Sequence, residues 1–232
     1  LILATGSRPF VPENAQLHLP GRFTIRKKDD ADRLRNYLEQ TQLPPEEQHV
    51  VIVGGGLLGL ELAAALKHKK VKITIIQRAS RLMERQLDRI SSKLLAEEVQ
   101  QRDIQIYFDN EVSTVFSTNR AHELEIALKS GRTLTANAIV YTIGTIPNIE
   151  VAKEAGLTCA RGVKVNQYLQ SSNPSIFAIG EIAEFNNQLF GITSAAEVSA
   201  LMRKLFDKIH ESIIIDAEIS QITSPNIVAE VI

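Results

Sequence analysis

Glycines dominate the one stretch of this sequence whose residue types and spacing suggest a specific chemistry, residues 54–59 (GGGLLG). The stretch contains the pattern G-x-G-x-x-G, in which each glycine meets a different steric demand. Gly54 permits a tight turn after a strand, Gly56 lets the backbone approach a pyrophosphate with no Cβ in between, and Gly59 allows close packing of a helix on the strand. The pattern therefore indicates a turn that binds the diphosphate of a dinucleotide.

The elements on either side of this turn are those that such a site requires. Residues 50–53 are a continuous apolar run, typical of a strand buried on both faces of a parallel sheet. Residues 57–69 have helical character, so the first N–H groups of the helix, at Leu57, Leu58 and Gly59, would face the phosphates. An ordinary glycine-rich turn is the alternative, and the strand–turn–helix context argues against it.

The end of the second strand, residues 71–76, is where an acidic side chain is expected to bind the adenosine ribose. The sequence has Gln77 there, whose amide can still hydrogen-bond a 2′-hydroxyl. Arg78, with Arg81 nearby, could instead pair with a 2′-phosphate, or the two arginines are solvated surface charges. The choice between NADH and NADPH therefore stays open on these residues.

Few single residues outside the turn suggest chemistry. Glu61 is expected on the first turn of the helix, where a carboxylate is often only a favourable charge, and where it could also contact the nicotinamide end of a cofactor. Cys159 is the only cysteine, which excludes an intrachain disulfide, a CxxC pair and a thiolate metal cluster within the chain. It is therefore interpreted as a small packed residue in a reducing, cytoplasmic compartment. No metal site and no catalytic side chain are predicted.

The apolar periodicity predicts an α/β fold, a doubly wound Rossmann-type parallel sheet. Strands are expected at 50–53, 71–76, 104–108 and 138–142, and helices at 29–42, 57–69, 88–102 and 193–209. Between the third and fourth of these strands lie three short extended segments, 112–117, 124–129 and 133–135, which predict a three-stranded antiparallel meander in place of the last crossover helix. Further short strands are expected at 163–165 and 175–179.

Composition excludes several classes of protein. The chain has 232 residues, 44% of them hydrophobic and 23% charged, an ordinary balance for a globular protein with a real core. A net charge of −1 gives no overall field for nucleic acid or an anionic membrane, and no apolar run approaches the roughly 20 residues that cross a bilayer. The chain has no signal peptide and begins without methionine in an apparent buried strand, so we expect a piece of a longer protein.

Three further segments, together with the glycine turn, resemble the flavoprotein reductases that carry two dinucleotides, the family of ferredoxin, rubredoxin and nitrite reductases. Residues 3–9 (LATGSRP) are similar to the family's A-T-G segment, where the chain leaves the flavin domain. Residues 139–148 (IVYTIGTIPN) are similar to its hydrophobic strand followed by G-x-x-P-N. Residues 175–181 (SIFAIGE) resemble the strand whose terminal acid holds the flavin ribityl chain.

The resemblance implies a set of cofactor contacts in addition to the glycine turn. It places Gly144 near the nicotinamide and Glu181 on the ribityl chain of FAD. The residues that it assigns to the flavin side are Ala4, Thr5, Gly6, Arg8, Gly180 and Glu181. For Glu181 a helix-capping or exposed carboxylate is the alternative.

Within the family, residues 83–88 (MERQLD), Glu181 and residues 186–191 (NNQLFG) together look most like the large subunit of NAD(P)H-dependent nitrite reductase. Rubredoxin reductase is similar over 162–185. The sequence also departs from the family. The first Rossmann motif, which binds the FAD diphosphate, would precede residue 1. Gln77 replaces the usual acid, Ile146 stands where an Arg is common, and no siroheme or iron–sulfur segment is present.

These observations lead to an expected organisation and function. Residues 1–22 are the end of a first FAD-domain segment and a linker, 23–144 the NAD(P)H-binding domain, 145–210 the second FAD-domain segment, and 211–232 an unassigned start of a further domain. The expected function is transfer of hydride from NAD(P)H, with NADH favoured, to the FAD of the full-length protein, and of electrons onward to an acceptor. The alternatives are a rubredoxin or ferredoxin reductase, a disulfide reductase, and a non-enzymatic NAD(P)-binding or redox-sensing module.

Overall fold

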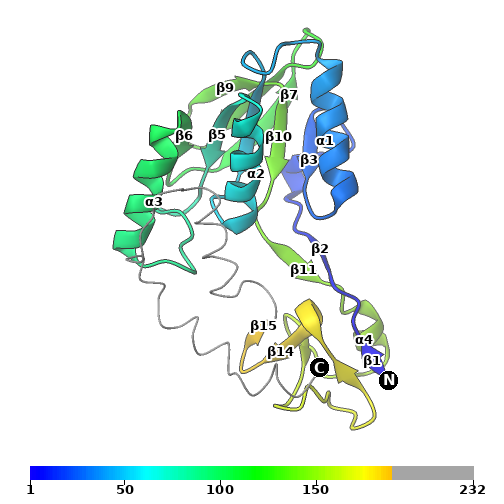
Figure 1. Ribbon diagram of the computed structural model, residues 1–232. Coiled ribbons are helices and arrows are strands. Elements are labelled where there is room, and N and C mark those ends of the chain that lie inside the picture. Colours follow the sequence, from blue (N-terminus) through cyan, green and yellow to red (C-terminus); the bar gives the residue numbers. More distant parts are fainter. Residues whose placement is uncertain (190–232) are drawn as a thin grey trace. The chain divides into compact units, whose positions relative to one another are not determined.

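The computed structural model describes residues 1–189, and these form two compact units (Figure 1). The larger unit is Pro9–Ile143, and the smaller one combines Leu1–Arg8 with residues 144–189. The helix expected at 193–209 and the unassigned residues 211–232 lie outside the described residues.

A five-stranded parallel sheet forms the larger unit, with the strand order β3-β10-β4-β5-β6. Its strands are β3 (Arg22–Thr24), β4 (His49–Val53), β5 (Lys72–Ile76), β6 (Ile104–Tyr107) and β10 (Ala138–Tyr141). The connections run through α1 (Lys28–Gln40), α2 (Leu57–His68) and α3 (Arg89–Gln101), and all three step in the same direction across the sheet. Because such crossovers are right-handed, the three helices lie on one face, as Figure 1 shows.

The connection from β6 back to β10 is the predicted three-stranded antiparallel meander. It comprises β7 (Val112–Ser117), β8 (Leu124–Leu128) and β9 (Thr133–Ala136). Buried residues of the meander form one hydrophobic cluster with Val51, Val53, Ile139 and Tyr141 of the sheet. The meander therefore covers the face that the helices leave free, and the predicted fold class is confirmed.

The central strand β4 is covered on both of its faces, which explains why it has no polar residue after His49. Side chains alternate between the faces of a strand, so Val51 and Val53 meet the meander while Val50 and Ile52 face the helices. Val50, Val51 and Ile52 are each fully buried. This is the environment that the continuous apolar run indicated.

Most predicted bounds agree with the structure to within one or two residues, as expected where helices and strands end. The edge strand β3 was not predicted, because its three residues alternate and begin with a charged Arg22. The predicted domain boundary at residues 22 and 23 falls inside the larger unit. The preceding 3-10 turn η1 (Glu13–Ala15) packs on β7, where Asn14 donates hydrogen bonds to the Val112 and Ser113 carbonyls.

The smaller unit consists of short elements around a separate core. Its elements are β1 (Ile2–Leu3), β2 (Ser7–Pro9), β11 (Thr145–Pro147), α4 (Glu150–Glu154), β12 (Val163–Lys164), β13 (Phe177–Ala178), η2 (Gly180–Ile182), β14 (Ala183–Phe185) and β15 (Gln188–Leu189). The first strand pairs in parallel with β13, and β2 pairs with β11. Segments from the start of the chain and from beyond residue 144 thus form one unit, which shares a core that includes Ile149, Val163 and Ile182.

Candidate dinucleotide site

Close packing around the turn between β4 and α2 requires glycine at two positions, 54 and 59. Gly54 has φ of +112°, and a Cβ there would lie 2.8 Å from the carbonyl oxygen of Thr142. A Cβ on Gly59 would lie 2.0 Å from the carbonyl oxygen of Gly54. Neither contact tolerates a side chain, so the turn can pass this close to the helix and to the end of β10 only with glycine at both positions.

Gly56 is different, because a Cβ there would meet nothing within 4 Å. Its backbone, with φ of −86°, is ordinary extended geometry, so neither packing nor strain requires glycine at this position. Gly56 is the N-cap of α2, and no side chain caps that end of the helix. The open side of Gly56 and the first N–H groups of α2, which include Leu57 and Leu58, thus form the kind of surface that a pyrophosphate approaches.

Thr142 fixes the turn from the end of β10 and was missed at the sequence level. Its backbone N–H donates to the Val53 carbonyl at 2.8 Å, and its buried Oγ1 lies 3.0 Å from the same oxygen and 3.2 Å from that of Gly54. A Cβ on Gly59 would lie 2.8 Å from this hydroxyl. The signal in the sequence was a single threonine at the end of a buried strand, 83 residues after the last glycine of the turn (142 − 59 = 83).

Gln77 is buried and its amide faces the glycine turn. Its Oε1 accepts a hydrogen bond of 2.7 Å from the Gly55 N–H, and its Nε2 donates to the Arg81 carbonyl at 3.1 Å. The residue that the pattern assigned to the ribose therefore also holds the turn. The side-chain NH₂ group of Gln77 has two N–H donors, and the second one takes no part in these two hydrogen bonds.

The segment after Gln77 folds back over the turn. The Met83 N–H donates to the Gly55 carbonyl at 3.0 Å, and Leu82 and Met83 are almost completely buried. The guanidinium of Arg81 donates to the Glu84 carbonyl at 2.8 Å. Arg78 is exposed. Its charge adds to the hydrogen bond from Lys129 in lowering the pKa of the Glu111 carboxyl.

Glu61 lies one turn further along α2 than expected. The helix begins at Leu57, with Gly56 as its N-cap, so Glu61 falls in the second turn and no acidic residue lies in the first. Its side chain is exposed. The interpretation of Glu61 as a helix-start charge is wrong, because the glycine turn ends at the N-cap and the first turn is entirely Leu-Leu-Gly-Leu.

In the smaller unit, Asn148 holds the segment that contains Ala4, Thr5 and Gly6. The Asn148 N–H donates to the Gly6 carbonyl and its Nδ2 to the Thr5 carbonyl, each at 2.9 Å. The Thr5 hydroxyl donates to the Asn148 carbonyl at 2.5 Å. The exposed guanidinium of Arg8 donates to Asn148 Oδ1 at 2.8 Å.

Glu181 lies in η2 and its carboxylate accepts a hydrogen bond of 2.7 Å from the Ser7 hydroxyl. Three glycines of this unit, Gly6, Gly144 and Gly180, have positive φ, and a Cβ on any of them would meet nothing within 4 Å. The backbone at these glycines is thus accessible from the side of the missing Cβ. Residues predicted to bind FAD therefore lie together around β1, β2 and η2, within one unit.

Other chemistry is not evident in the part of the chain that the structure describes. Burial raises the pKa of the Cys159 thiol, which packs against the core of the smaller unit, so its reactive thiolate is disfavoured. Within residues 1–189, no group of three or more His, Cys, Asp or Glu is arranged to hold a metal ion. None of the described helices is long and apolar enough to cross a membrane.

The sequence of the chain is similar to those of known oxidoreductases. The sequence model of the pyridine nucleotide-disulphide oxidoreductase family matches residues 1–203. The assimilatory nitrate reductase electron transfer subunit of Bacillus subtilis is 32% identical over 194 residues, which are 84% of this chain and 24% of that protein. The nitrite reductase [NAD(P)H] of the same organism is 32% identical over 196 residues, 84% of this chain and 23% of that protein. The chain thus spans about a quarter of the length of these curated relatives.

Two solved structures have the same fold. A ferredoxin reductase from Rhodopseudomonas palustris superposes with a TM-score of 0.74 and 26% identity, over 91% of this chain and 53% of that one. The covalent putidaredoxin reductase–putidaredoxin complex superposes with a TM-score of 0.74 and 26% identity, over 88% of this chain and 49% of that one. The resemblance inferred from the sequence is confirmed.

Proposed function

Because the chain belongs to the pyridine nucleotide-disulphide oxidoreductase family, we propose that its unit of residues 9–143 binds NAD(P)H and presents it to FAD in a flavoprotein oxidoreductase. The observation that carries this proposal is the open side of Gly56 at the uncapped start of α2. Glycine is required by packing at Gly54 and Gly59, whereas at Gly56 only an approaching ligand explains it.

On this proposal the chain binds and orients, and performs no covalent step of its own. The N–H groups at Leu57, Leu58 and Gly59 would bind the pyrophosphate, while Thr142 and Gln77 hold the turn in place. When bound, the flavin supplies the redox chemistry. Glu61, exposed on the second turn of α2, is a candidate contact for the nicotinamide end.

For the flavin, we propose Ala4, Thr5, Gly6, Arg8, Gly180 and Glu181 as contacts, with Gly144 near the nicotinamide. The open Cβ directions of Gly6, Gly144 and Gly180 fit a large planar cofactor that approaches the backbone. The carboxylate of Glu181, oriented by Ser7, suits a hydroxyl-bearing chain such as ribityl. Residues 145–210 would accordingly belong to the FAD-binding domain, and 211–232 to a further one.

We propose NADH as the preferred donor. Gln77 retains one amide N–H that can serve a ribose diol, and the nearby Arg81 guanidinium is turned toward the Glu84 carbonyl. Arg78 is the basic side chain left for a 2′-phosphate, and it is exposed, where an ionic contact contributes little.

The acceptor that we propose is a redox protein or domain in a nitrite reductase-like, cytoplasmic system. The names of the two curated relatives, an electron transfer subunit and a nitrite reductase, support it. The likeness to a ferredoxin reductase and to a putidaredoxin reductase supports the second candidate, a ferredoxin or rubredoxin reductase.

Reduction of ferricyanide by NADH, catalysed by the intact parent protein loaded with FAD, tests the proposal. An oxidoreductase should turn over many equivalents of dye, whereas a sensor module should bind NADH and bleach at most one flavin. With nitrite and with rubredoxin as alternative acceptors, the same assay separates the two candidate functions.

A further inference from the structure

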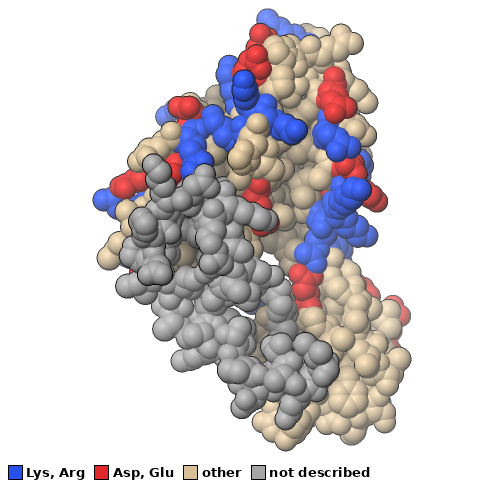
Figure 2. Space-filling model, viewed as in Figure 1, with Lys and Arg blue, Asp and Glu red and all other residues tan. Residues whose placement is uncertain are grey.

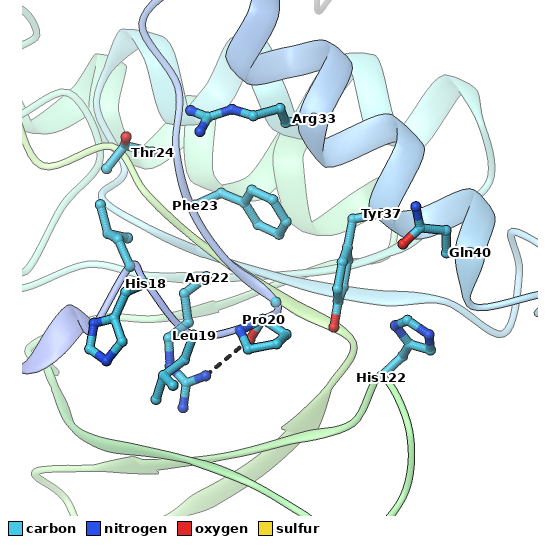
Figure 3. A pocket seen from close by; sticks show the side chains of 12 residues that line it. His18, Leu19, Pro20, Arg22, Phe23, Thr24, Arg33, Tyr37, Gln40 and His122 are labelled. Carbon is cyan, nitrogen blue, oxygen red and sulfur yellow. Dashed lines mark hydrogen bonds between the residues drawn. The ribbon is translucent and has the colours of Figure 1, made fainter.

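The larger unit has an open pocket at the amino end of its parallel sheet, the end opposite the glycine turn (Figure 3). It has a volume of about 460 Å³, within the range of small-molecule sites. The lining is formed by residues 17–24, by Arg33, Tyr37 and Gln40 of α1, and by His122 from the meander. Nothing in the proposed dinucleotide chemistry uses this pocket.

A buried cation lies beneath the pocket. Arg22 is only 4% exposed, and its guanidinium donates to the carbonyls of Pro20 and Val115 at 3.0 Å each. A longer bond of 3.4 Å runs to the Ser117 hydroxyl. All three partners are neutral, and the Nε of Arg22 has no hydrogen-bond partner. Burial lowers the pKa of this guanidinium, against a smaller opposite effect of the nearby Tyr141 and Tyr37. A buried cation without a carboxylate is costly, so a bound anion nearby would be stabilised by it.

The pocket also has an aromatic wall. Tyr37 lies between Phe23 and His122, with ring centroids 5.3 Å and 5.1 Å away and both pairs edge to face, as Figure 3 shows. Gly21, with φ of +77°, passes close beneath: a Cβ there would lie 3.0 Å from the Tyr37 hydroxyl. The wall is therefore held on two sides, and an aromatic wall is a surface on which a planar ligand can pack.

In the described part of the chain, the residues that line the opening include two arginines and no carboxylate. The described residues that line the pocket include Arg22, Arg33, His18 and His122, and no Asp or Glu. Arg33 pairs with Asp30 on its own helix, which leaves further donors of its guanidinium fork available. On the face that Figure 2 shows, by contrast, basic and acidic side chains are interspersed.

We propose that this pocket binds a small organic anion with a planar ring, the ring against Tyr37, the anionic group toward the exposed Arg33, and the buried charge of Arg22 beneath. The site would be separate from the dinucleotide turn by the length of the sheet, about 3.3 Å for each strand residue. It therefore gives the unit a place for a second ligand.

The test is an NMR titration of the full ¹⁵N-labelled chain with benzoate, which has both a planar ring and an anionic group. Acetate, which has only the anionic group, and benzamide, which has only the ring, are the comparison ligands. Benzoate should shift the amides of Phe23, Tyr37 and His122, with a dissociation constant in the millimolar range. Acetate and benzamide should each bind at least about fivefold more weakly, since each lacks one of the two contacts.

Two variants separate the charge from the ring. Arg33→Gln should weaken benzoate about two- to fivefold, as for an exposed ionic contact. Arg35→Gln is its matched control, because Arg35 is equally exposed on α1, pairs with Asp32 at the same spacing and does not line the pocket. Tyr37→Leu should remove the advantage of benzoate over acetate. The proposal is overturned if benzoate binds no better than both probes, if its shifts lie at the glycine turn, or if the two arginine variants behave alike.

Discussion

The Oε1 of Gln77 accepts a hydrogen bond of 2.7 Å from the backbone N–H of Gly55. The bond joins the end of β5 to the middle of the glycine turn, and both residues are buried. It means that the position after the second strand has a structural task in this chain in addition to the ribose contact inferred from the pattern. The glycine turn is held from three sides, by Gln77, by Thr142 and by the Met83 N–H.

We expect Gln77→Leu to lower the free energy of unfolding by about 1–3 kcal/mol, because the buried Gly55 N–H loses its acceptor. Urea denaturation of the chain measures this loss. Gln105→Leu is the control, since Gln105 is an exposed residue of β6 and its replacement should cost no more than about 0.5 kcal/mol. Equal effects for the two variants would mean that the Gln77 bond contributes nothing.

Gly56→Val should abolish dinucleotide binding and leave the fold intact, because its side chain would occupy the open space at the start of α2. Gly59→Ala should do the reverse and destabilise the unit, because its Cβ would lie 2.0 Å from the Gly54 carbonyl oxygen. Fluorescence titration with NADH and thermal unfolding of both variants check the contrast. Unchanged NADH affinity in Gly56→Val would rule out the proposed site.

Arg78→Ala should leave the affinity for NADH unchanged and weaken NADPH by no more than about 1 kcal/mol, the range for an exposed ionic contact. The reason is that Arg78 is exposed at the end of β5, where only a 2′-phosphate would require it. Isothermal titration with both nucleotides measures the two losses. If they are equal, Arg78 is a surface charge and takes no part in cofactor choice.

His49 should make the stability depend on pH. Its Nδ1 lies 2.7 Å from the Thr135 carbonyl and its Nε2 2.9 Å from Thr74 Oγ1, and desolvation lowers its pKa in the folded chain. The unfolded chain therefore binds the proton more readily than the folded one. The contribution of His49 is fully present above the ordinary histidine pKa of about 6.5, and is lost as the pH falls through the lowered folded-state pKa.

Urea denaturation between pH 7.5 and about pH 5 checks this dependence. His49→Gln should show a shallower fall in the free energy of unfolding over this range than the unaltered chain. His68→Gln, a change at an exposed position near the end of α2, should keep the full slope. A slope that is the same in all three proteins would contradict the role given to His49.

The sequence was sufficient for the glycine turn because one of its steric demands arises between near neighbours in the chain. Gly59 excludes a Cβ because of the Gly54 carbonyl, five residues away in the chain. The strands of the sheet were predicted for a similar reason, since burial on two faces leaves a continuous apolar run. Gly56 was assigned to the ligand from the same pattern, and a Cβ there would meet nothing within 4 Å.

What the sequence did not predict depends on residues far apart in the chain. Thr142 contacts the glycine turn although it lies 83 residues beyond it in the chain (142 − 59). The amide of Gln77 points toward the same turn, where its Oε1 accepts a hydrogen bond from the buried Gly55 N–H. Edge strand β3 is too short and too polar to stand out in a pattern. The start of α2 was predicted correctly at residue 57, but Glu61, the fifth residue of the helix, was counted in its first turn.

We expect Asn148 to be the main residue that holds residues 1–8 against the rest of the smaller unit, which begins at residue 144. It makes four hydrogen bonds to Thr5, Gly6 and Arg8, three of which involve its side chain or its carbonyl. Asn148→Ala removes the two side-chain bonds, whereas the backbone bond to the Gly6 carbonyl can persist. Each lost bond is worth about 0.5–1.5 kcal/mol, so local opening should become about 5- to 150-fold more frequent.

Hydrogen exchange of backbone amides measures that opening directly. Protection of amides in β1, such as Leu3, and of the facing Ile179 should fall in Asn148→Ala, while β4 and β5 of the larger unit keep their exchange rates. Asn166→Ala is the matched control, because Asn166 is an exposed asparagine of the same unit whose side chain bonds only its own loop. If the two variants expose β1 equally, the segment is held by β1–β13 pairing alone, and Asn148 is not the residue that orients the proposed flavin contacts Thr5 and Gly6.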